Sequence, residues 1–315
     1  MIDLLDRSLL FITGKGGVGK STVAASLAVL AASRGKRTLV CEVDAKGNLA
    51  DFFETGPTGF EPRQVQPKLW AMSMDTEASL KEYLSLQLKL PLLARIGPLA
   101  RTFEFVATAA PGVKEILTVG KLCWEVRERH YDLVVVDAVA TGHIVGQLTA
   151  PQSINELVQV GLVRNQTGWM LDILNDPAQT GVVIVSAPEE MPVNETIELS
   201  QHLVEETHVD LAAVIVNRVL PELFGRGEEK IFDELSEPGR VEELSKVIGG
   251  DAQPMIDAAE LAVTLRRTRA EHLTTLRENL PAGLPVIYLP YLFVRTHGVR
   301  ATNRVAEHLA EELVS

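Results

Sequence analysis

Short runs of apolar residues recur along the chain and alternate with segments of helix-forming composition. Such runs, bounded by glycine, proline or charged residues, are typical of strands that are buried on both faces of a sheet. Because helical segments separate the runs, the pattern predicts an α/β fold with a doubly wound, mostly parallel sheet. We expect strands at residues 8–13, 38–43, 69–74, 133–136, 182–186, 211–216 and 286–289.

Three stretches contain helical patterns without a clear strand, and we expect them to be helical insertions. Residues 76–130 are rich in leucine and alanine, residues 153–176 add a further helix, and residues 221–280 are dense in charge. Prolines and glycines divide these stretches into shorter helices. We expect all three above the carboxyl ends of the strands, as a lid or subdomain of one domain spanning residues 1–315. Two separate domains are the alternative.

The composition is that of a globular chain with an excess of acid. The 315 residues include 30 Lys+Arg and 42 Asp+Glu, a formal net charge of −12, and 46% are hydrophobic. An acidic surface repels phosphate backbones, so we expect no nucleic-acid partner. Residues 1–7 lack the apolar core of a signal peptide, and prolines interrupt the longest uncharged runs. We therefore expect a cytoplasmic protein without stable membrane insertion.

The thiol content of the chain consists of two cysteines, Cys41 and Cys123. A single pair that is far apart in sequence builds neither a disulfide framework nor a cysteine-rich zinc site. We interpret both residues as small buried hydrophobic side chains.

A glycine-rich loop follows the first predicted strand and precedes a predicted helix at residues 21–33. It satisfies the pattern G-x-x-x-x-G-K-[ST] of a phosphate-binding loop. Glycines let successive backbone N–H groups turn toward a phosphate, and the helix adds its positive N-terminus. The pattern therefore predicts a P-loop NTPase that binds ATP with Mg²⁺. The residues expected to contact the nucleotide are Gly14, Lys15, Gly16, Gly17, Val18, Gly19, Lys20, Ser21 and Thr22.

Side chains of this loop have separate expected roles. Lys20 would contact the β- and γ-phosphates, Ser21 would ligate Mg²⁺, and Thr22 would donate to the α-phosphate. With Lys15 the loop resembles the deviant phosphate loop of the MinD/ParA/ArsA class. In that class the early lysine reaches the nucleotide of the partner subunit, which implies a dimer. A solvated loop residue is the alternative interpretation of Lys15.

Two carboxylates end predicted strands and are expected near the phosphates. Asp44 follows the second strand and could orient an attacking water molecule, unless it only caps the following helix. Asp137 closes the run Leu-Val-Val-Val, as the Walker B acid of P-loop ATPases does, and would hold Mg²⁺ directly or through water. We expect Lys15, Lys20 and Asp44 to be catalytic, and Ser21 and Asp137 to bind the metal.

Longer segments resemble the ArsA/Get family of ATPases within this class. Residues 44–49 match its Asp-Pro-Ala-His switch, with alanine and glycine in place of the proline and the histidine. Residues 138–143 match its Thr-Ala-Pro-Thr-Gly-His segment, with Ala140 in place of the proline. Residues 110–117 and 187–196 are similar to two further segments, so the resemblance covers nearly the whole chain.

The resemblance also implies an adenine site. Residues 214–218 are similar to a strand of that family that ends in an asparagine contacting adenine, and Asn217 and Arg218 stand at this place. An amide can form two hydrogen bonds with adenine N6 and N7. Pro290 and Tyr291 stand where the family has a loop packing on the adenine face. A turn residue is the alternative interpretation of Asn217.

The family's known cargo sites have no counterpart among the cysteines. Arsenite pumps hold their metalloid with a set of cysteines, and the Get proteins clamp their dimer with a Cys-x-x-Cys zinc site. Neither site can be built from Cys41 and Cys123. An iron–sulfur protein of the same class would need cluster cysteines near Asp137.

We therefore expect a dimeric switch ATPase of the ArsA/Get type, of the bacterial branch, that hydrolyses ATP slowly without its partner. ATP and ADP would be its ligands and Mg²⁺ its cofactor. Its partners would be a second copy or an ArsA-like paralogue, and an unidentified protein client. The altered switch residues Ala45, Gly47 and Ala140 favour an alternative, a nucleotide-gated regulatory subunit with weak hydrolysis that pairs with such a paralogue. A MinD/ParA-like positioning ATPase ranks lower.

Overall fold

The computed structural model describes residues 4–44, 48–88, 112–157, 162–222, 225–292 and 298–314. Within these ranges one eight-stranded sheet runs in the order β3-β4-β2-β5-β1-β6-β7-β8. Neighbouring strands are parallel except for the β3–β4 pair. The strands are β1 (Leu9–Gly14), β2 (Thr38–Glu42), β3 (Arg63–Gln66), β4 (Leu69–Ser73), β5 (Leu133–Asp137), β6 (Thr180–Ser186), β7 (Leu211–Val219) and β8 (Val286–Pro290).

The predicted doubly wound, mostly parallel α/β sheet is confirmed, and each predicted strand is present. The sequence pattern does not predict β3, because Arg-Gln-Val-Gln contains no apolar run. This strand lies at the edge of the sheet, where polar side chains can stay in water. β7 continues past the predicted end at residue 216, so Asn217 lies inside the strand.

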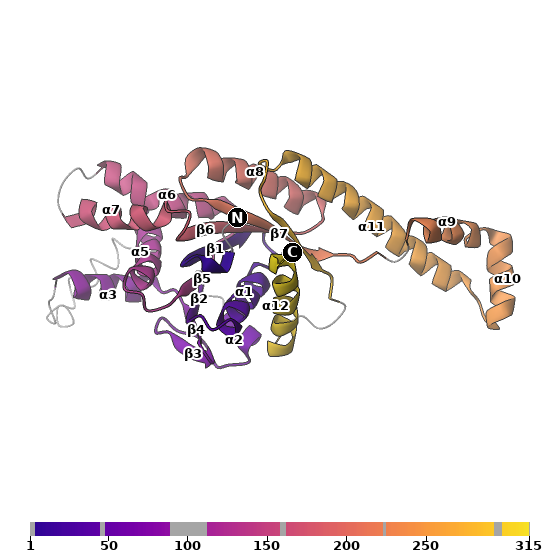
Figure 1. Cartoon of the computed structure of the whole chain (residues 1–315), viewed down its shortest axis with the longest axis horizontal. Coiled ribbons are helices and arrows are strands. Elements are labelled where there is room, and N and C mark those ends of the chain that lie inside the picture. The colour runs from indigo at the N-terminus through magenta and orange to yellow at the C-terminus, as the bar shows by residue number, and fades with distance from the viewer. Residues whose placement is uncertain are drawn as a thin grey trace.

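Helices cover both faces of the sheet (Figure 1). The helices on one face are α1 (Lys20–Ser33), α2 (Asn48–Phe53) and α12 (Val299–Val314). Those on the other face are α5 (Val113–Arg127), α6 (Thr141–Leu157), α7 (Leu162–Leu174) and α8 (Glu190–Glu206). Leu10 and Ile12 of β1 face the first layer and Leu9 and Phe11 face the second. Burial on both faces is why the strands are continuous apolar runs.

Helix α1 holds the glycine-rich loop against the sheet. Residues 23–31 of this helix are all buried between the sheet, α2 and α12. Its alanines and leucines are strong helix formers and tolerate contact on every side. The helix ends at Ser33, and Gly35 follows with φ 93°, a left-handed conformation that stops a helix. The loop at its N-terminus is therefore anchored to a rigid, buried element.

Helix α5 corrects one expectation about the insertions. We expect residues 76–130 and 153–176 above the strand ends, but α5 and α7 pack on the face of the sheet. Val119, Leu122 and Cys123 are buried in the same apolar cluster as strand residues of β1 and β2. Their spacing gives the helix one apolar side, which the sheet covers. Helix α3 (Thr76–Leu88) packs in turn on α5.

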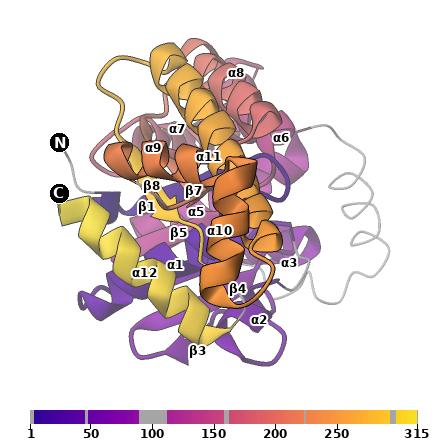
Figure 2. The same cartoon turned by 90° about the vertical axis from the view of Figure 1, so that its right-hand side faces the viewer.

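Part of the 221–280 stretch forms an arm that projects away from the sheet (Figure 1), and Figure 2 shows the molecule from the side of this arm, with α9 and α10 toward the viewer. We call residues 226–265 the arm: α9 (Arg226–Leu235), α10 (Pro238–Ile248) and the outer part of α11 (Gln253–Asn279). The arm has a small apolar cluster of its own. At its base, Arg266 donates to the carbonyl oxygen of Leu220 at 2.7 Å, which ties α11 to the end of β7. Exposed large hydrophobic side chains on the arm are Ile231, Leu235, Val247, Ile248, Met255, Leu261 and Leu265.

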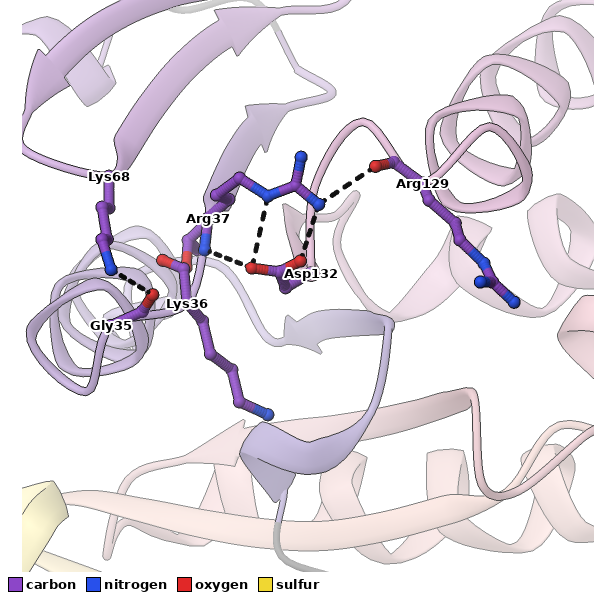
Figure 3. A network of polar contacts seen from close by, with 7 residues as sticks. Gly35, Lys36, Arg37, Lys68, Arg129 and Asp132 are labelled. Carbon is purple, nitrogen blue, oxygen red and sulfur yellow. Dashed lines mark hydrogen bonds and ion pairs between the residues drawn. The ribbon is translucent and has the colours of Figure 1, made fainter.

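A polar network fixes the amino ends of β2 and β5 (Figure 3). The Arg37 guanidinium donates to the Asp132 carboxylate at 2.8 Å and to the Arg129 carbonyl oxygen at 3.2 Å. The side-chain hydrogen bond from Arg37 lowers the pKa of Asp132. The network lies at the start of the β2–β5 pair, whose register brings Glu42 opposite Asp137 at the far end.

Cys41 on β2 and Cys123 on α5 are both buried, as predicted, and burial raises the pKa of each thiol. None of the helices in the described ranges is long and apolar enough to cross a membrane.

Candidate functional site

A polar cavity of about 340 Å³ lies at the carboxyl end of the sheet, between the glycine-rich loop and the ends of β2 and β5. Ligands of open α/β sheets bind at this edge. Most of the predicted loop residues and both predicted acids meet there. The cavity is lined by Gly16, Gly17, Gly19, Lys20, Ser21, Thr22, Glu42, Asp44, Asp51, Phe52, Asp137, Ala138 and Ala140.

The conformation of the loop requires glycine at two positions. Gly14 has φ 144°, and a Cβ there would lie 2.1 Å from the carbonyl oxygen of Val185 on β6. Gly19 has φ 100°, and a Cβ there would lie 2.4 Å from the side-chain nitrogen of Asn217. Both positions combine a conformation that disfavours other residues with a close approach of neighbouring atoms. The loop is therefore pressed against β6 on one side and β7 on the other.

Lys20 lines the cavity and Lys15 does not. The Lys20 ammonium group donates to the backbone carbonyl oxygen of Lys15 at 3.1 Å. The Lys15 side chain turns instead toward α8, where its ammonium group forms an ion pair with Glu195. The two lysines thus occupy different surroundings. Lys15 is a partly exposed loop residue that pairs with Glu195, and its contact with the nucleotide of a partner subunit stays a prediction.

The Asn217 side chain is hydrogen-bonded to the glycine-rich loop. Its side-chain nitrogen donates to the carbonyl oxygen of Val18 at 2.8 Å, and its oxygen accepts from the backbone N–H of Arg218 at 2.9 Å. Pro290 and Tyr291 lie on or just after the neighbouring strand β8, and the Tyr291 N–H donates to the Val219 carbonyl at 2.8 Å. The four residues predicted for the adenine site are therefore on adjacent strands, outside the cavity lining. Their contact with adenine stays a prediction.

Asp137 is a buried carboxylate, 5% exposed, at the end of β5. Its pKa is raised to about 6. Burial is the largest cause, the carboxylates of Glu42 and Asp44 act in the same direction, and the Ser21 hydroxyl and Lys20 act in the opposite direction. A nearby cation would stabilise the ionised form of a carboxylate with these neighbours. Asp44 itself is exposed at the cavity, and residues 45–47 of the same switch lie outside the described residues.

Sequence reasoning missed three residues of the cavity lining. Glu42 is 1% exposed and stands opposite Asp137 in the β2–β5 register. Asp51 and Phe52 come from α2, which folds back toward the loop. An acid at the end of an otherwise apolar strand run is a signal that could have found Glu42, because such an acid lies at the functional edge of a parallel sheet.

Replacing Asp137 with asparagine is expected to stabilise the ligand-free protein at neutral pH by about 1–3 kcal/mol. The folded-state pKa lies above the ordinary value of 3.8, so the folded chain binds this proton more tightly than the unfolded chain. The stability from this group is therefore complete below about pH 4 and is lost as the pH rises through about 6. Urea unfolding at about pH 4.5 and about pH 7.5 should show the larger gain at the higher pH.

Asp132→Asn is the control of opposite sign. Arg37 lowers the pKa of Asp132, so its stabilising effect is present above the ordinary pKa and is lost as the pH falls. The asparagine variant should therefore lose stability at neutral pH. An Asp137→Asn gain of equal size at both pH values would contradict the raised pKa of Asp137.

Comparison with known proteins identifies the family. The sequence profile described as anion-transporting ATPase matches residues 7–171 and 163–228, more than half of the chain. "ATPase BagA" of Mycobacterium tuberculosis is 32% identical over 221 residues, which cover 67% of this chain and 64% of that protein. A "Putative arsenical pump-driving ATPase" of Halobacterium salinarum is 27% identical over 300 residues, which cover 88% of this chain and 44% of that protein.

An "ATPase ASNA1 homolog" of Entamoeba dispar is 28% identical over 254 residues, which cover 67% of this chain and 76% of that protein. The chain thus spans less than two thirds of the mycobacterial relative's length and less than half of the haloarchaeal relative's. The profile match includes the glycine-rich loop, Asp44, Asp137 and Asn217. The chain therefore belongs to the anion-transporting ATPase family, and its resemblance to the ArsA/Get-like ATPases is confirmed.

Proposed function

We propose that this chain is a Mg²⁺-dependent switch ATPase that binds ATP in the polar cavity and couples the nucleotide state to a protein partner. The observation that carries the proposal is the convergence on one cavity of the glycine-rich loop, Lys20, Ser21, Asp44 and Asp137. These groups are the cation, the hydroxyl and the acids that phosphoryl transfer uses. Family membership supports the same activity.

The charges around the cavity fit a nucleotide that arrives with a divalent cation. Four carboxylates line the cavity together with the ammonium group of Lys20. A bare triphosphate would add negative charge to this set, whereas Mg²⁺ offsets it. Ser21 and Asp137 would hold the ion, because both line the cavity and offer the oxygen donors that Mg²⁺ prefers.

A full metal-binding cluster is not needed for this role. In the described ranges no three His, Cys, Asp or Glu side chains form a metal site by themselves. Mg²⁺ in phosphoryl-transfer sites is usually bound through one or two protein groups together with substrate phosphates. When bound, Mg²⁺ neutralises the charge that develops on the transferred phosphate.

Protein groups would then divide the remaining work. The backbone N–H groups of the loop and Lys20 would hold the β- and γ-phosphates. Asp44, exposed at the cavity, would orient the attacking water. Lys15 would supply a second cation to a bound nucleotide, in a dimer with a second copy or an ArsA-like paralogue, as its resemblance to the deviant loop implies.

Helix α6 offers a route from the nucleotide to a client. It begins at Thr141, directly after the cavity residues Ala138 and Ala140. Further along the helix, Ile154 lines a second, apolar cavity of about 220 Å³ between α3, α5, α6 and α7. A shift at the start of α6 would therefore reach that cavity directly. This apolar cavity is lined by helices of the predicted insertions, which supports the binding of a protein client there. We expect the protein to act in the cytoplasm.

Mg²⁺-dependent hydrolysis tests the proposal. Ser21→Ala is expected to lower the hydrolysis rate about 10- to 100-fold, because it removes a metal donor. Ser33→Ala is the matched control, since this serine ends the same helix and its hydroxyl donates to Leu30 at 2.7 Å. Phosphate release should be measured with Mg²⁺ and with excess EDTA. If the unmodified chain does not bind ATP, the proposal is wrong.

The second candidate is a nucleotide-gated regulatory subunit with weak hydrolysis. Ala140 favours it, because this alanine lines the cavity where the ArsA/Get switch has a proline. Single-turnover hydrolysis with and without an ArsA-like paralogue separates the two functions: tight binding with turnover only in the pair supports the regulatory subunit. A MinD/ParA-like positioning ATPase remains the lower alternative.

A further inference from the structure

The carboxylate of Glu195 contacts two segments of the nucleotide site at once. One oxygen pairs with the ammonium group of Lys15 in the glycine-rich loop. The other accepts a hydrogen bond from the Thr141 hydroxyl at 3.1 Å. Thr141 is the first residue of α6, which follows the end of β5 at Asp137 by a short connection. Glu195 therefore joins the loop before α1 to the start of α6.

Glu195 stands on a well-anchored part of α8. The neighbouring Thr196 is 1% exposed, and its hydroxyl bonds to the Ser186 hydroxyl at 3.0 Å and the Pro192 carbonyl at 2.7 Å. The bond to Ser186 ties the second turn of α8 to the end of β6, and the bond to Pro192 lies within α8. Lys15, by contrast, is in a loop, although the side chains of Lys15 and Glu195 are equally exposed, at 29% each. If the pair separates, the lysine moves and the glutamate stays.

The pairing changes the charge that the loop offers to a ligand. Lys20 faces the cavity, whereas the charge of Lys15 is offset by Glu195. A nucleotide phosphate can pair with the Lys15 ammonium group only by displacing the Glu195 carboxylate. After this exchange Glu195 keeps its hydrogen bond to Thr141 but loses Lys15, so the exchange alters the contacts at the start of α6.

We propose that Glu195 is a positioning residue that holds Lys15 away from the nucleotide until phosphate displaces it. The inference rests on the proposed function and concerns its regulation. The Glu195 carboxylate then couples nucleotide binding at the glycine-rich loop to the contacts of Thr141 at the start of α6. Nucleotide affinity in the ligand-free chain is accordingly weaker than the loop alone would give.

Glu195→Gln should therefore tighten binding of a fluorescent Mg²⁺-ATP analogue about three- to tenfold, since it removes the competing charge. The matched control is Glu198→Gln, which makes the same charge change one turn later on α8, at a residue that is 72% exposed and lies 3.8 Å from His202. This control should leave the affinity unchanged.

A double-mutant cycle separates the pairing from general electrostatics. In a Lys15→Met background the effect of Glu195→Gln should vanish, because no ammonium group remains to be released. A gain that persists in this background would overturn the proposal, as would an unchanged affinity in Glu195→Gln alone. Thermal unfolding of each variant tests for a purely structural role, which lowers stability without tightening binding. If the wild-type chain binds no nucleotide, the proposed function fails instead.

Discussion

Lys20→Ala is expected to weaken Mg²⁺-ATP binding at least about 100-fold and to abolish measurable hydrolysis. Lys20 supplies the ammonium group of a cavity lining that also contains four carboxylates. Its removal leaves the triphosphate facing acidic side chains, with uncharged backbone N–H groups and the hydroxyls of Ser21 and Thr22 as donors in the cavity lining. Because the desolvated site screens charge less than water does, the lost attraction is large. Isothermal titration calorimetry and phosphate release measure the two effects.

A surface lysine provides the control for this substitution. Lys246→Ala removes the same charge from α10, where the side chain is exposed, and should change neither binding nor hydrolysis. Lys20 also donates to the Lys15 carbonyl oxygen at 3.1 Å, so unfolding of Lys20→Ala should be compared with the wild type. A folded Lys20→Ala variant that still binds Mg²⁺-ATP with wild-type affinity would refute the assignment of this cavity.

Gly14→Ala is expected to lower the free energy of unfolding by at least about 3 kcal/mol. The new Cβ would lie 2.1 Å from the Val185 carbonyl oxygen, in a backbone conformation of φ 144° that alanine disfavours. Relief requires moving β1 away from β6 at the centre of the sheet. Because β1 also leads into the glycine-rich loop, nucleotide affinity should fall together with stability. Chemical denaturation measures the loss.

Gly16→Ala is the control within the same loop. A Cβ at Gly16 would meet no atom within 4 Å, and its φ lies outside the left-handed region. We therefore expect its unfolding free energy to stay within about 0.5 kcal/mol of the wild type. Equal stability of the Gly14 and Gly16 variants would show that the close approach of β1 to β6 is absent in solution.

The parts of the site that could be predicted from the sequence depend on local patterns. The glycine-rich loop and Asp137 each occupy a few consecutive residues next to a clear strand, so motif and element can be recognised together. The buried strands could be found because both of their faces are covered. Expectations for α5 failed because its apolar side at Val119 and Leu122 is equally consistent with packing on another helix.

The residues that sequence reasoning missed act through contacts between distant segments. Glu195 is 180 positions from Lys15 in the chain. Its side chain contacts Lys15 only because α8 packs beside the glycine-rich loop. Glu42 requires the register of β2 against β5, which a strand pattern alone does not fix. Asn217 was predicted as an adenine contact, but the backbone partner that it has in the structure, Val18, depends on the approach of β7 to the loop.

The two buried cysteines have a practical consequence. Burial keeps Cys41 and Cys123 protonated at neutral pH and shields them from solvent, whereas alkylating reagents attack exposed thiolates. Thiol-specific labelling of this chain therefore does not require the replacement of Cys41 and Cys123, so the core can be left unchanged. A cysteine introduced by Val247→Cys, at a side chain that is 83% exposed on the arm, becomes a selective attachment point for a fluorophore or spin label. The fluorescence or the mobility of such a label would report on the arm through a nucleotide cycle.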